Sequence, residues 1–145
     1  MNSNLHYECV LAEHAVLRAS EEVNAADVER LAARIAQAGQ WTTPIPIERS
    51  TGIIMDGNHR WHAARLLRLS HLPCIPIDYG DPRVRILRWV DGSDFPVTDI
   101  HATLSSGRVL PYKSTRHLFE PPLPELCHTL ASLRRLSATA RSAGG

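Results

Sequence analysis

The sequence predicts one small α+β domain, in which short strands form a mixed sheet flanked by helices. Its 145 residues are enough for one ordinary domain and too few for two. Short apolar runs, several of them containing proline, alternate with longer segments in which apolar residues recur at helical spacing. This alternation is typical of a small α/β or α+β domain. We assign residues 1–136 to that domain and expect residues 137–145, which are rich in Ala, Ser and Gly, to form a disordered tail.

A strand and a helix are expected to come first. Residues 7–16 contain enough Val and Leu to join a sheet. A helix is predicted over residues 24–39, because Asn24 can cap its start, Asp27 lies in its first turn, and Gly39 can adopt the left-handed conformation that ends a helix.

The next segment, residues 44–48, alternates like a strand. Pro44 and Pro46 have no N–H to donate to a neighbouring strand, so this strand is predicted to lie at a sheet edge. A turn is expected at residues 50–52, and it leads into a return strand over residues 53–55.

The middle of the chain is predicted to continue with a second helix over residues 58–69 and a strand over residues 72–79. Pro73 and Pro76 inside this strand again favour an edge position. Residues 84–90 are predicted to form a further strand or a short helix.

The last part is predicted to contain two helices on either side of a loop. The first helix covers residues 96–104 and can be capped from Ser93 or Asp94, and the second covers residues 125–136. Residues 109–117 lie between them, show no periodicity and are expected to form an irregular segment.

The composition excludes several classes of protein. A net charge of +1 gives no electrostatic reason to expect a dedicated nucleic-acid binder. No apolar run is long enough to cross a bilayer, and residues 1–10 lack the features of a signal peptide, so a cytoplasmic location is expected. Cys9, Cys74 and Cys127 are scattered and are expected to be small buried hydrophobic residues, and no zinc-binding spacing is present.

The most informative segment is the predicted strand-to-helix junction at residues 53–64. The first N–H groups of a helix have no intrahelical partner and lie at the positive end of its dipole, so this junction suits a phosphate group. Gly57 lets the backbone approach a ligand closely, Arg60 can grip phosphate oxygens with two donors, and His59 can exchange a proton near neutral pH.

Asp56 has the opposite charge at the same junction. A carboxylate beside a phosphate is repelled unless a divalent metal lies between them or the carboxylate accepts a proton, so Asp56 points to Mg²⁺ or to a base. The alternative is that Asp56 caps the helix and Arg60 is a surface charge, and local spacing alone leaves both interpretations open.

Three further groups have a structural and a functional interpretation. Glu21 lies just before the first helix, where acidic residues are common for electrostatic reasons, but it could also act in catalysis. Trp89 would be a core aromatic residue in most domains, and its place beside a small polar pocket is implied only by the family resemblance described below. The dense set of donors and bases between Leu110 and Leu118 is either a solvated loop or, as we favour, a binding segment.

The D-G-N-H-R-W sequence of residues 56–61 resembles the ParB-like and sulfiredoxin-like superfamily, and it is similar to the D-G-H-H-R-W form of the free L-serine kinases. Two other segments strengthen this resemblance. Glu21 occupies the place of a glutamate that these kinases carry between the first strand and the first helix, and residues 110–117 resemble their S-P-K-T-T-R-H segment. The resemblance covers most of residues 5–120 and implies a ParB/sulfiredoxin-like fold.

The resemblance implies transfer of a phosphoryl group from ATP or ADP to the hydroxyl of free L-serine, which gives O-phospho-L-serine. It implies three sets of site residues. The catalytic residues would be Glu21, Asp56 and His59, with Asp56 also binding Mg²⁺. The nucleotide phosphates would be held by Gly57, Asn58, His59, Arg60 and Lys113. The serine would be bound by Trp89, Ser114, Thr115, Arg116 and His117, where the role of Arg116 as a carboxylate ligand is assigned from its chemistry alone.

The chain also departs from the kinases. Asn58 stands where they have a histidine, and a long insertion between their Trp and their C-terminal motif is absent, so the choice between ATP and ADP stays open. The alternative function is a nucleotide-binding ParB-like regulator associated with DNA. A sulfinic-acid reductase is disfavoured, because Asn58 stands where its catalytic thiol is expected. The expected partners are therefore a nucleotide and L-serine, without a membrane or nucleic acid, and a homodimer is left open.

Overall fold

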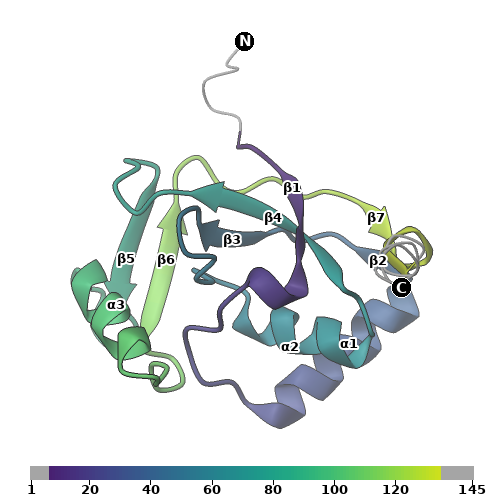
Figure 1. The fold of residues 1–145 in the computed structure, drawn as a ribbon, viewed down its shortest axis with the longest axis horizontal. Helices are drawn as coiled ribbons and strands as arrows, with labels where there is room; N and C mark the ends of the chain where they lie inside the picture. Colours follow the sequence, from purple (N-terminus) through teal and green to yellow (C-terminus); the bar gives the residue numbers. More distant parts are fainter. Residues whose placement is uncertain (1–6, 135–145) are drawn as a thin grey trace.

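A mixed three-stranded sheet forms the centre of the computed structural model, which describes residues 7–134 (Figure 1). The predicted tail, residues 137–145, lies outside the described residues. In the sheet, β4 (His71–Ile77) lies between β1 (Val10–Glu13), which is antiparallel to it, and β3 (Ile45–Glu48), which is parallel to it. A 3-10 turn, η2 (His14–Val16), follows β1. The small α+β fold that the sequence predicts is confirmed.

The position of β4 corrects an expectation. Its prolines predicted an edge strand, but β4 is the central strand of this sheet. β1 pairs only with residues 71–74 of β4 and β3 only with residues 74–77. Pro73 therefore precedes the part that pairs with β3, and Pro76 follows the part that pairs with β1. Each proline has one unpaired side, which explains how a strand with two missing donors can be central.

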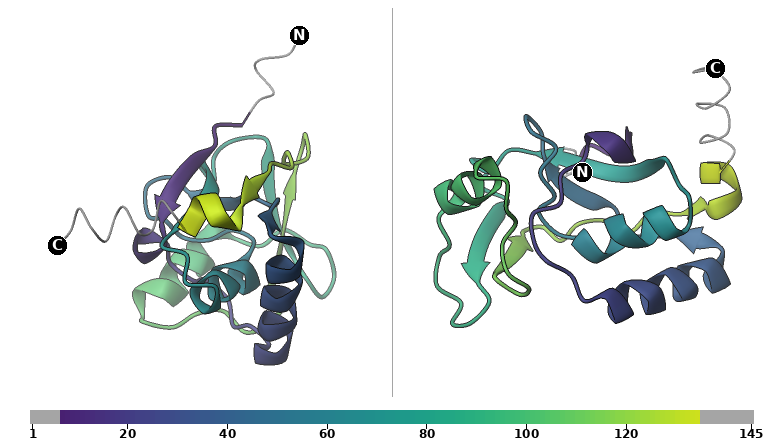
Figure 2. Two further views of the ribbon diagram at one scale, coloured as in Figure 1. Left: turned by 90° about the vertical axis from the view of Figure 1, so that its right-hand side faces the viewer. Right: turned by 60° about the horizontal axis from the view of Figure 1, so that its bottom comes forward.

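Two helices, α1 (Ala25–Ala38) and α2 (Asn58–Leu66), lie side by side against this sheet (Figure 2). The Asn24 side chain caps α1 by accepting a hydrogen bond from the Asp27 N–H at 3.0 Å, and Gly39 ends the helix with a φ of 71°. Both end signals are as predicted. The main core between helices and sheet includes Trp41 and Leu72, both fully buried. None of the helices within residues 7–134 combines the length and the apolar character that crossing a bilayer requires.

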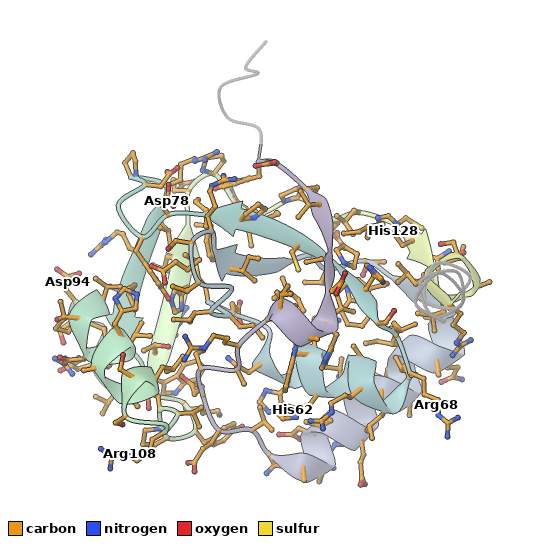
Figure 3. The ribbon with its side chains drawn as sticks, in the orientation of Figure 1. His62, Arg68, Asp78, Asp94, Arg108 and His128 are labelled. Atoms are coloured by element: carbon orange, nitrogen blue, oxygen red, sulfur yellow. The ribbon has the colours of Figure 1, made fainter. Side chains whose placement is uncertain are left out.

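A smaller unit packs beside the central sheet and consists of the antiparallel pair β5 (Val84–Arg88) and β6 (Thr115–Phe119) with helix α3 (Val97–Ser105) (Figure 1). Asp94 and Arg108, which flank α3, lie at the outer edge of the molecule, on the opposite side from His128 (Figure 3). Pro96 precedes α3 without a side-chain cap, so the predicted caps at Ser93 or Asp94 are wrong. The predicted loop 109–117 becomes a strand from residue 115, because β5 offers it a pairing partner.

The remaining differences concern short segments. The predicted return strand at residues 53–55 is reduced to isolated bridges, including one between Ile47 and Ile54. In place of a helix over residues 125–136, β7 (His128–Thr129) pairs with β2 (Gln40–Trp41), and helical structure begins at residue 130.

The three cysteines differ in how far they are buried. Cys74 is fully buried, as predicted, because it lies in the central strand, whereas Cys9 and Cys127 are exposed, which makes the prediction wrong for them.

The turn at residues 50–52, which follows β3, gives a stability prediction. Gly52 has a φ of 76°, and a β-carbon on it would clash with the Val16 carbonyl oxygen, whereas Gly39 has a φ of 71° and open space around it. Gly39→Ala is expected to lower the free energy of unfolding by about 1 kcal/mol, the cost of a left-handed alanine. Gly52→Ala should cost about 2 kcal/mol more, because the backbone must also move. Urea titrations of both variants measure the difference, and equal losses would contradict this account.

Candidate functional site

A polar cavity of about 430 Å³ opens where α2 begins. Its wall comes from the segment before α1, from α1 itself, from the start of α2, from the end of β5 and from β6. The lining residues are Glu21, Glu22, Leu31, Met55, Asp56, Gly57, Asn58, His59, Arg60, Trp89, Thr115, Arg116, His117 and Leu118. The structure thus brings together the three segments that the sequence singled out. Lys113 and Ser114 are the predicted site residues that do not line the cavity.

Gly57 sets the geometry of the junction before α2, where the sequence predicts a phosphate site. It precedes α2 with a φ of 104°, and a β-carbon there would lie 3.3 Å from Cγ1 of Ile45. The first helical hydrogen bond runs from the Trp61 N–H to the Gly57 carbonyl at 3.0 Å. The N–H groups of residues 58–60 therefore have no partner within the helix and offer donors to an anion.

Arg60 supplies a positive charge beside these donors. Its guanidinium makes no hydrogen bond or ion pair with any side chain in residues 7–134, so its five donors can serve a ligand. Desolvation lowers the pKa of Arg60 and the nearby Asp56 raises it, but an arginine stays charged throughout the physiological range.

Burial acts on the Asp56 carboxyl group in the opposite direction, because it disfavours a negative charge. Desolvation raises the pKa of its carboxyl group, while a hydrogen bond from the Gly57 N–H and the charges of Arg60 and His59 act to lower it. Within the described residues no group of three or more His, Cys, Asp or Glu side chains could hold a metal ion by itself. A metal beside Asp56 would therefore need ligands other than a cluster of His, Cys, Asp and Glu side chains.

The Glu21 carboxylate is held by the backbone of the segment before β6. Its Oε2 accepts a hydrogen bond from the Lys113 N–H at 3.0 Å, and its Oε1 accepts bonds from the Thr115 N–H and hydroxyl at 3.2 Å each. Lys113 adopts a φ of 58°, which turns successive N–H groups toward the carboxylate. Desolvation nevertheless outweighs these bonds and raises the pKa of Glu21.

The Asn58 side chain is committed to the protein rather than to the cavity. It is 9% exposed, and its Oδ1 accepts bonds from the N–H groups of Ser20 at 2.8 Å and Glu21 at 3.4 Å. Its Nδ2 donates to the Ser20 hydroxyl, which donates to the Ile54 carbonyl at 2.6 Å. Asn58 thus fixes the backbone of Glu21 against α2. Of the polar groups of Asn58, the backbone N–H is the one that remains available for a phosphate group. Ser20 has no local sequence signal that could have predicted this role.

Removing the Asn58 amide is expected to destabilise the protein. In Asn58→Ala the buried Ser20 N–H loses its acceptor, so the free energy of unfolding should fall by about 2–3 kcal/mol. Asn24→Ala is the matched control, because it removes a single exposed cap and should cost about 1 kcal/mol. Urea titration compares the two variants, and a loss in Asn58→Ala no larger than in the control would refute the account.

His59 and Lys113 both lie close to the ring of Tyr112. The Nε2 of His59 accepts a hydrogen bond from the Asn24 N–H at 3.2 Å, which places the proton of a neutral ring on Nδ1. The His59 ring also meets Tyr112 edge-on at 5.9 Å. Nδ1 is therefore the ring nitrogen of His59 that is left for a ligand.

Trp89 lies at the cavity wall with 47% of its surface exposed, so it is not a core residue. The Lys113 ammonium lies 5.1 Å and the Arg116 guanidinium 5.7 Å from the centre of its ring. The backbone N–H of Trp89 donates to the Ser114 carbonyl at 3.0 Å, and the Ser114 hydroxyl donates to the Pro111 carbonyl. Lys113 and Ser114 therefore contact Trp89 without lining the cavity themselves.

His117 lines the cavity from β6 and is partly buried. Burial lowers its pKa to about 4, so the ring is neutral at physiological pH. Its Nε2 lies 3.1 Å from the hydroxyl of Tyr79, a residue that the sequence did not indicate.

No protein-family model matches the chain. Over 88 residues it is 33% identical to an ATP-dependent L-serine kinase of Staphylothermus marinus, and over 46 residues it is 37% identical to a ParB-like protein of Sulfolobus acidocaldarius. The first match covers 58% of this chain and 35% of the kinase, and the second covers 32% of this chain and 23% of the ParB-like protein. The chain thus matches about a third of the kinase's length.

A solved structure of free serine kinase in complex with AMP superposes with a TM-score of 0.77 at 13% identity, covering 88% of this chain and 94% of that one. At this identity the likeness establishes the fold. Together, the comparisons confirm the resemblance drawn from the sequence: this chain has the fold of the free serine kinase and is similar in sequence both to an ATP-dependent L-serine kinase and to a ParB-like protein.

Proposed function

We propose that this protein is a small-molecule kinase that transfers a phosphoryl group from ATP or ADP to the hydroxyl of free L-serine and produces O-phospho-L-serine. The observation that carries the proposal is the convergence of a desolvated carboxylate, Glu21, and the start of α2 on one polar cavity. The cavity volume of about 430 Å³ falls in the range of small-molecule sites. The name of the Staphylothermus marinus relative supports the substrate and the nucleotide class.

The N–H groups of residues 58–60 and the Arg60 guanidinium hold the nucleotide phosphates in this mechanism. Glu21 accepts the proton of the substrate hydroxyl. At the same time the hydroxyl oxygen of the substrate bonds to the terminal phosphorus, and the bond from that phosphorus to the leaving nucleotide oxygen breaks. The raised pKa of Glu21 makes it a stronger base than an exposed glutamate. Lys113 and Thr115 hold Glu21 in place, so little reorganisation is needed during the reaction.

Asp56 fits a role as the carboxylate ligand of Mg²⁺. Mg²⁺ is usually bound by one or two carboxylates together with substrate phosphates, and Asp56 lies at the phosphate-binding junction. When bound, the metal would neutralise charge on the transferring phosphate. The substrate amino acid would be bound by Trp89, Thr115, Arg116 and His117, with the Arg116 guanidinium on its carboxylate.

The direct test is product formation. Purified protein is incubated with L-serine, MgCl₂ and either ATP or ADP, and O-phosphoserine is measured by mass spectrometry. Reactions with threonine and homoserine define the acceptor, and omission of MgCl₂ tests the metal. Absence of a phosphorylated product with both nucleotides and all three amino acids would reject the proposal.

The second candidate is a nucleotide-dependent regulator that associates with DNA, and the similarity to a ParB-like protein favours it. The net charge of +1 argues against it. Salt-dependent retention on DNA that changes with added nucleotide, without phosphoserine formation, would support this candidate over the kinase.

A further inference from the structure

We propose that Tyr79 is a positioning residue that fixes the tautomer of His117, so that the imidazole presents its Nδ1–H to an acceptor oxygen of the substrate. This inference rests on the proposed function and adds a residue to its site. Tyr79 follows β4, whereas His117 lies in β6, and the two side chains meet with the Tyr79 Oη 3.1 Å from the His117 Nε2. The contact therefore joins the central sheet to the strand that lines the cavity.

The Tyr79 ring is fixed by its surroundings. It packs against an apolar cluster that includes Ile53 and Ile100, and it meets the His101 ring edge-on at 6.2 Å. His101 is itself anchored, because its Nε2 lies 2.9 Å from the Glu48 carboxylate. These contacts hold the Tyr79 ring in the position in which its hydroxyl meets His117.

Both partners are neutral in the physiological range. Burial and the nearby Glu48 charge raise the pKa of Tyr79 well above its ordinary value, so its hydroxyl keeps its proton. Burial lowers the pKa of His117 to about 4, so its ring carries one N–H and one lone pair.

The hydroxyl proton decides between the two tautomers of His117. Among residues 7–134, His117 is the hydrogen-bond partner of the Tyr79 hydroxyl. If the His117 Nε2–H donated to Tyr79, the hydroxyl proton would have no acceptor among the described residues, and unsatisfied buried donors are costly. The Tyr79 O–H therefore donates to Nε2, and the ring proton of His117 resides on Nδ1.

This assignment defines what His117 does in the cavity. Its Nδ1–H makes no hydrogen bond within the described residues, so it is the polar atom of the ring that remains for a ligand. An N–H donor recognises a carboxylate or hydroxyl oxygen of an amino acid and cannot remove a proton from it. The proton of the substrate hydroxyl is thus left to Glu21.

The tautomer can be measured in the free protein, without any reaction. Long-range ¹H–¹⁵N spectra of the ¹⁵N-labelled protein distinguish the protonated from the bare ring nitrogen, and the His117→Asn spectrum identifies the His117 signals. We expect a protonated Nδ1 in the unmodified protein and a mixture of both tautomers in Tyr79→Phe. A protonated Nε2 in the unmodified protein, or an unchanged tautomer in Tyr79→Phe, would overturn the inference.

Steady-state kinetics test the donor role. Tyr79→Phe is expected to raise the KM for serine about tenfold, with kcat and nucleotide affinity changed by less than about threefold. Tyr7→Phe is the matched control, since it removes a hydroxyl that donates to the Pro121 carbonyl outside the cavity, and its serine KM should stay at the unmodified value. Equal KM values in the two variants would overturn the donor role.

Two substitutions of His117 provide a rescue experiment. The amide nitrogen of asparagine can replace Nδ1, whereas that of glutamine replaces Nε2. His117→Asn should therefore keep a serine KM several-fold lower than His117→Gln, and the reverse order would refute the proposal. If the unmodified protein forms no phosphoserine, the proposed function fails, and the spectra of the free protein still decide whether Tyr79 sets the His117 tautomer.

Discussion

Replacing Glu21 by glutamine is expected to lower the rate of phosphoserine formation about a thousandfold. Glutamine has one side-chain oxygen, which can accept the bonds from the Thr115 N–H and hydroxyl, whereas the bond from the Lys113 N–H to the second oxygen is lost. A thermal melt of the variant checks that the fold is kept. Glutamine cannot take the proton from the attacking hydroxyl. Because Glu21 does not hold the phosphates, the nucleotide Kd should change by less than about threefold, and calorimetry with ADP and single-turnover rates measure the two quantities separately.

The control for this variant is Glu13→Gln, which removes an exposed carboxylate on β1 outside the cavity. Its rate should equal that of the unmodified protein. The pH dependence adds an independent check, because a base must be deprotonated to act. Since burial raises the pKa of Glu21, we expect activity to be lost at a higher pH, as the pH is lowered, than it would be with an exposed glutamate as the base. A Glu21→Gln variant that keeps normal rates would exclude Glu21 as the base.

Removing the Arg60 side chain should mainly weaken nucleotide binding. Charge-assisted hydrogen bonds from an arginine contribute roughly 1.5–3 kcal/mol, so Arg60→Ala is expected to raise the Kd for ADP by about 10- to 100-fold. The guanidinium makes no hydrogen bond within residues 7–134, so the free energy of unfolding should change little. Titration calorimetry gives the Kd, and a thermal melt checks the fold.

Arg65→Ala is the matched control, because Arg65 lies on the same helix but its guanidinium lies over the Trp61 ring, away from the cavity. Its nucleotide Kd should match that of the unmodified protein. If both variants bind ADP equally well, the start of α2 is not the phosphate site. Arg60→Lys should recover part of the affinity, since lysine keeps the charge and loses the two-pronged geometry.

Local signals in the sequence predicted α1 accurately, because its ends depend on residues next to each other. Asn24 and Gly39 act as caps through their own side chain and backbone conformation, which the sequence shows directly. The position of β4 could not be predicted in this way. A proline disfavours a central strand only where its missing N–H faces a paired neighbour, and that depends on which half of β4 each neighbour covers.

The same distinction applies to the site. The junction at residues 56–60 could be found because a glycine, an arginine and a helix start are adjacent in the chain, and the resemblance supplied Glu21 and residues 113–117. Ser20 and Tyr79 were missed, since a serine or tyrosine hydroxyl has no local pattern that reveals a distant partner. Asn58 was assigned to phosphate, but its side chain is occupied by the backbone of Ser20 and Glu21.

The hydrogen bonds that hold the Glu21 carboxylate come from residues 92 and 94 positions further along the chain. Closing such a long loop costs conformational entropy, and the partners gain from it only when the intervening segments have folded. The proposed catalytic geometry is therefore a property of the completed tertiary structure, and a partly folded chain that has formed α1 and α2 alone would still lack a competent site.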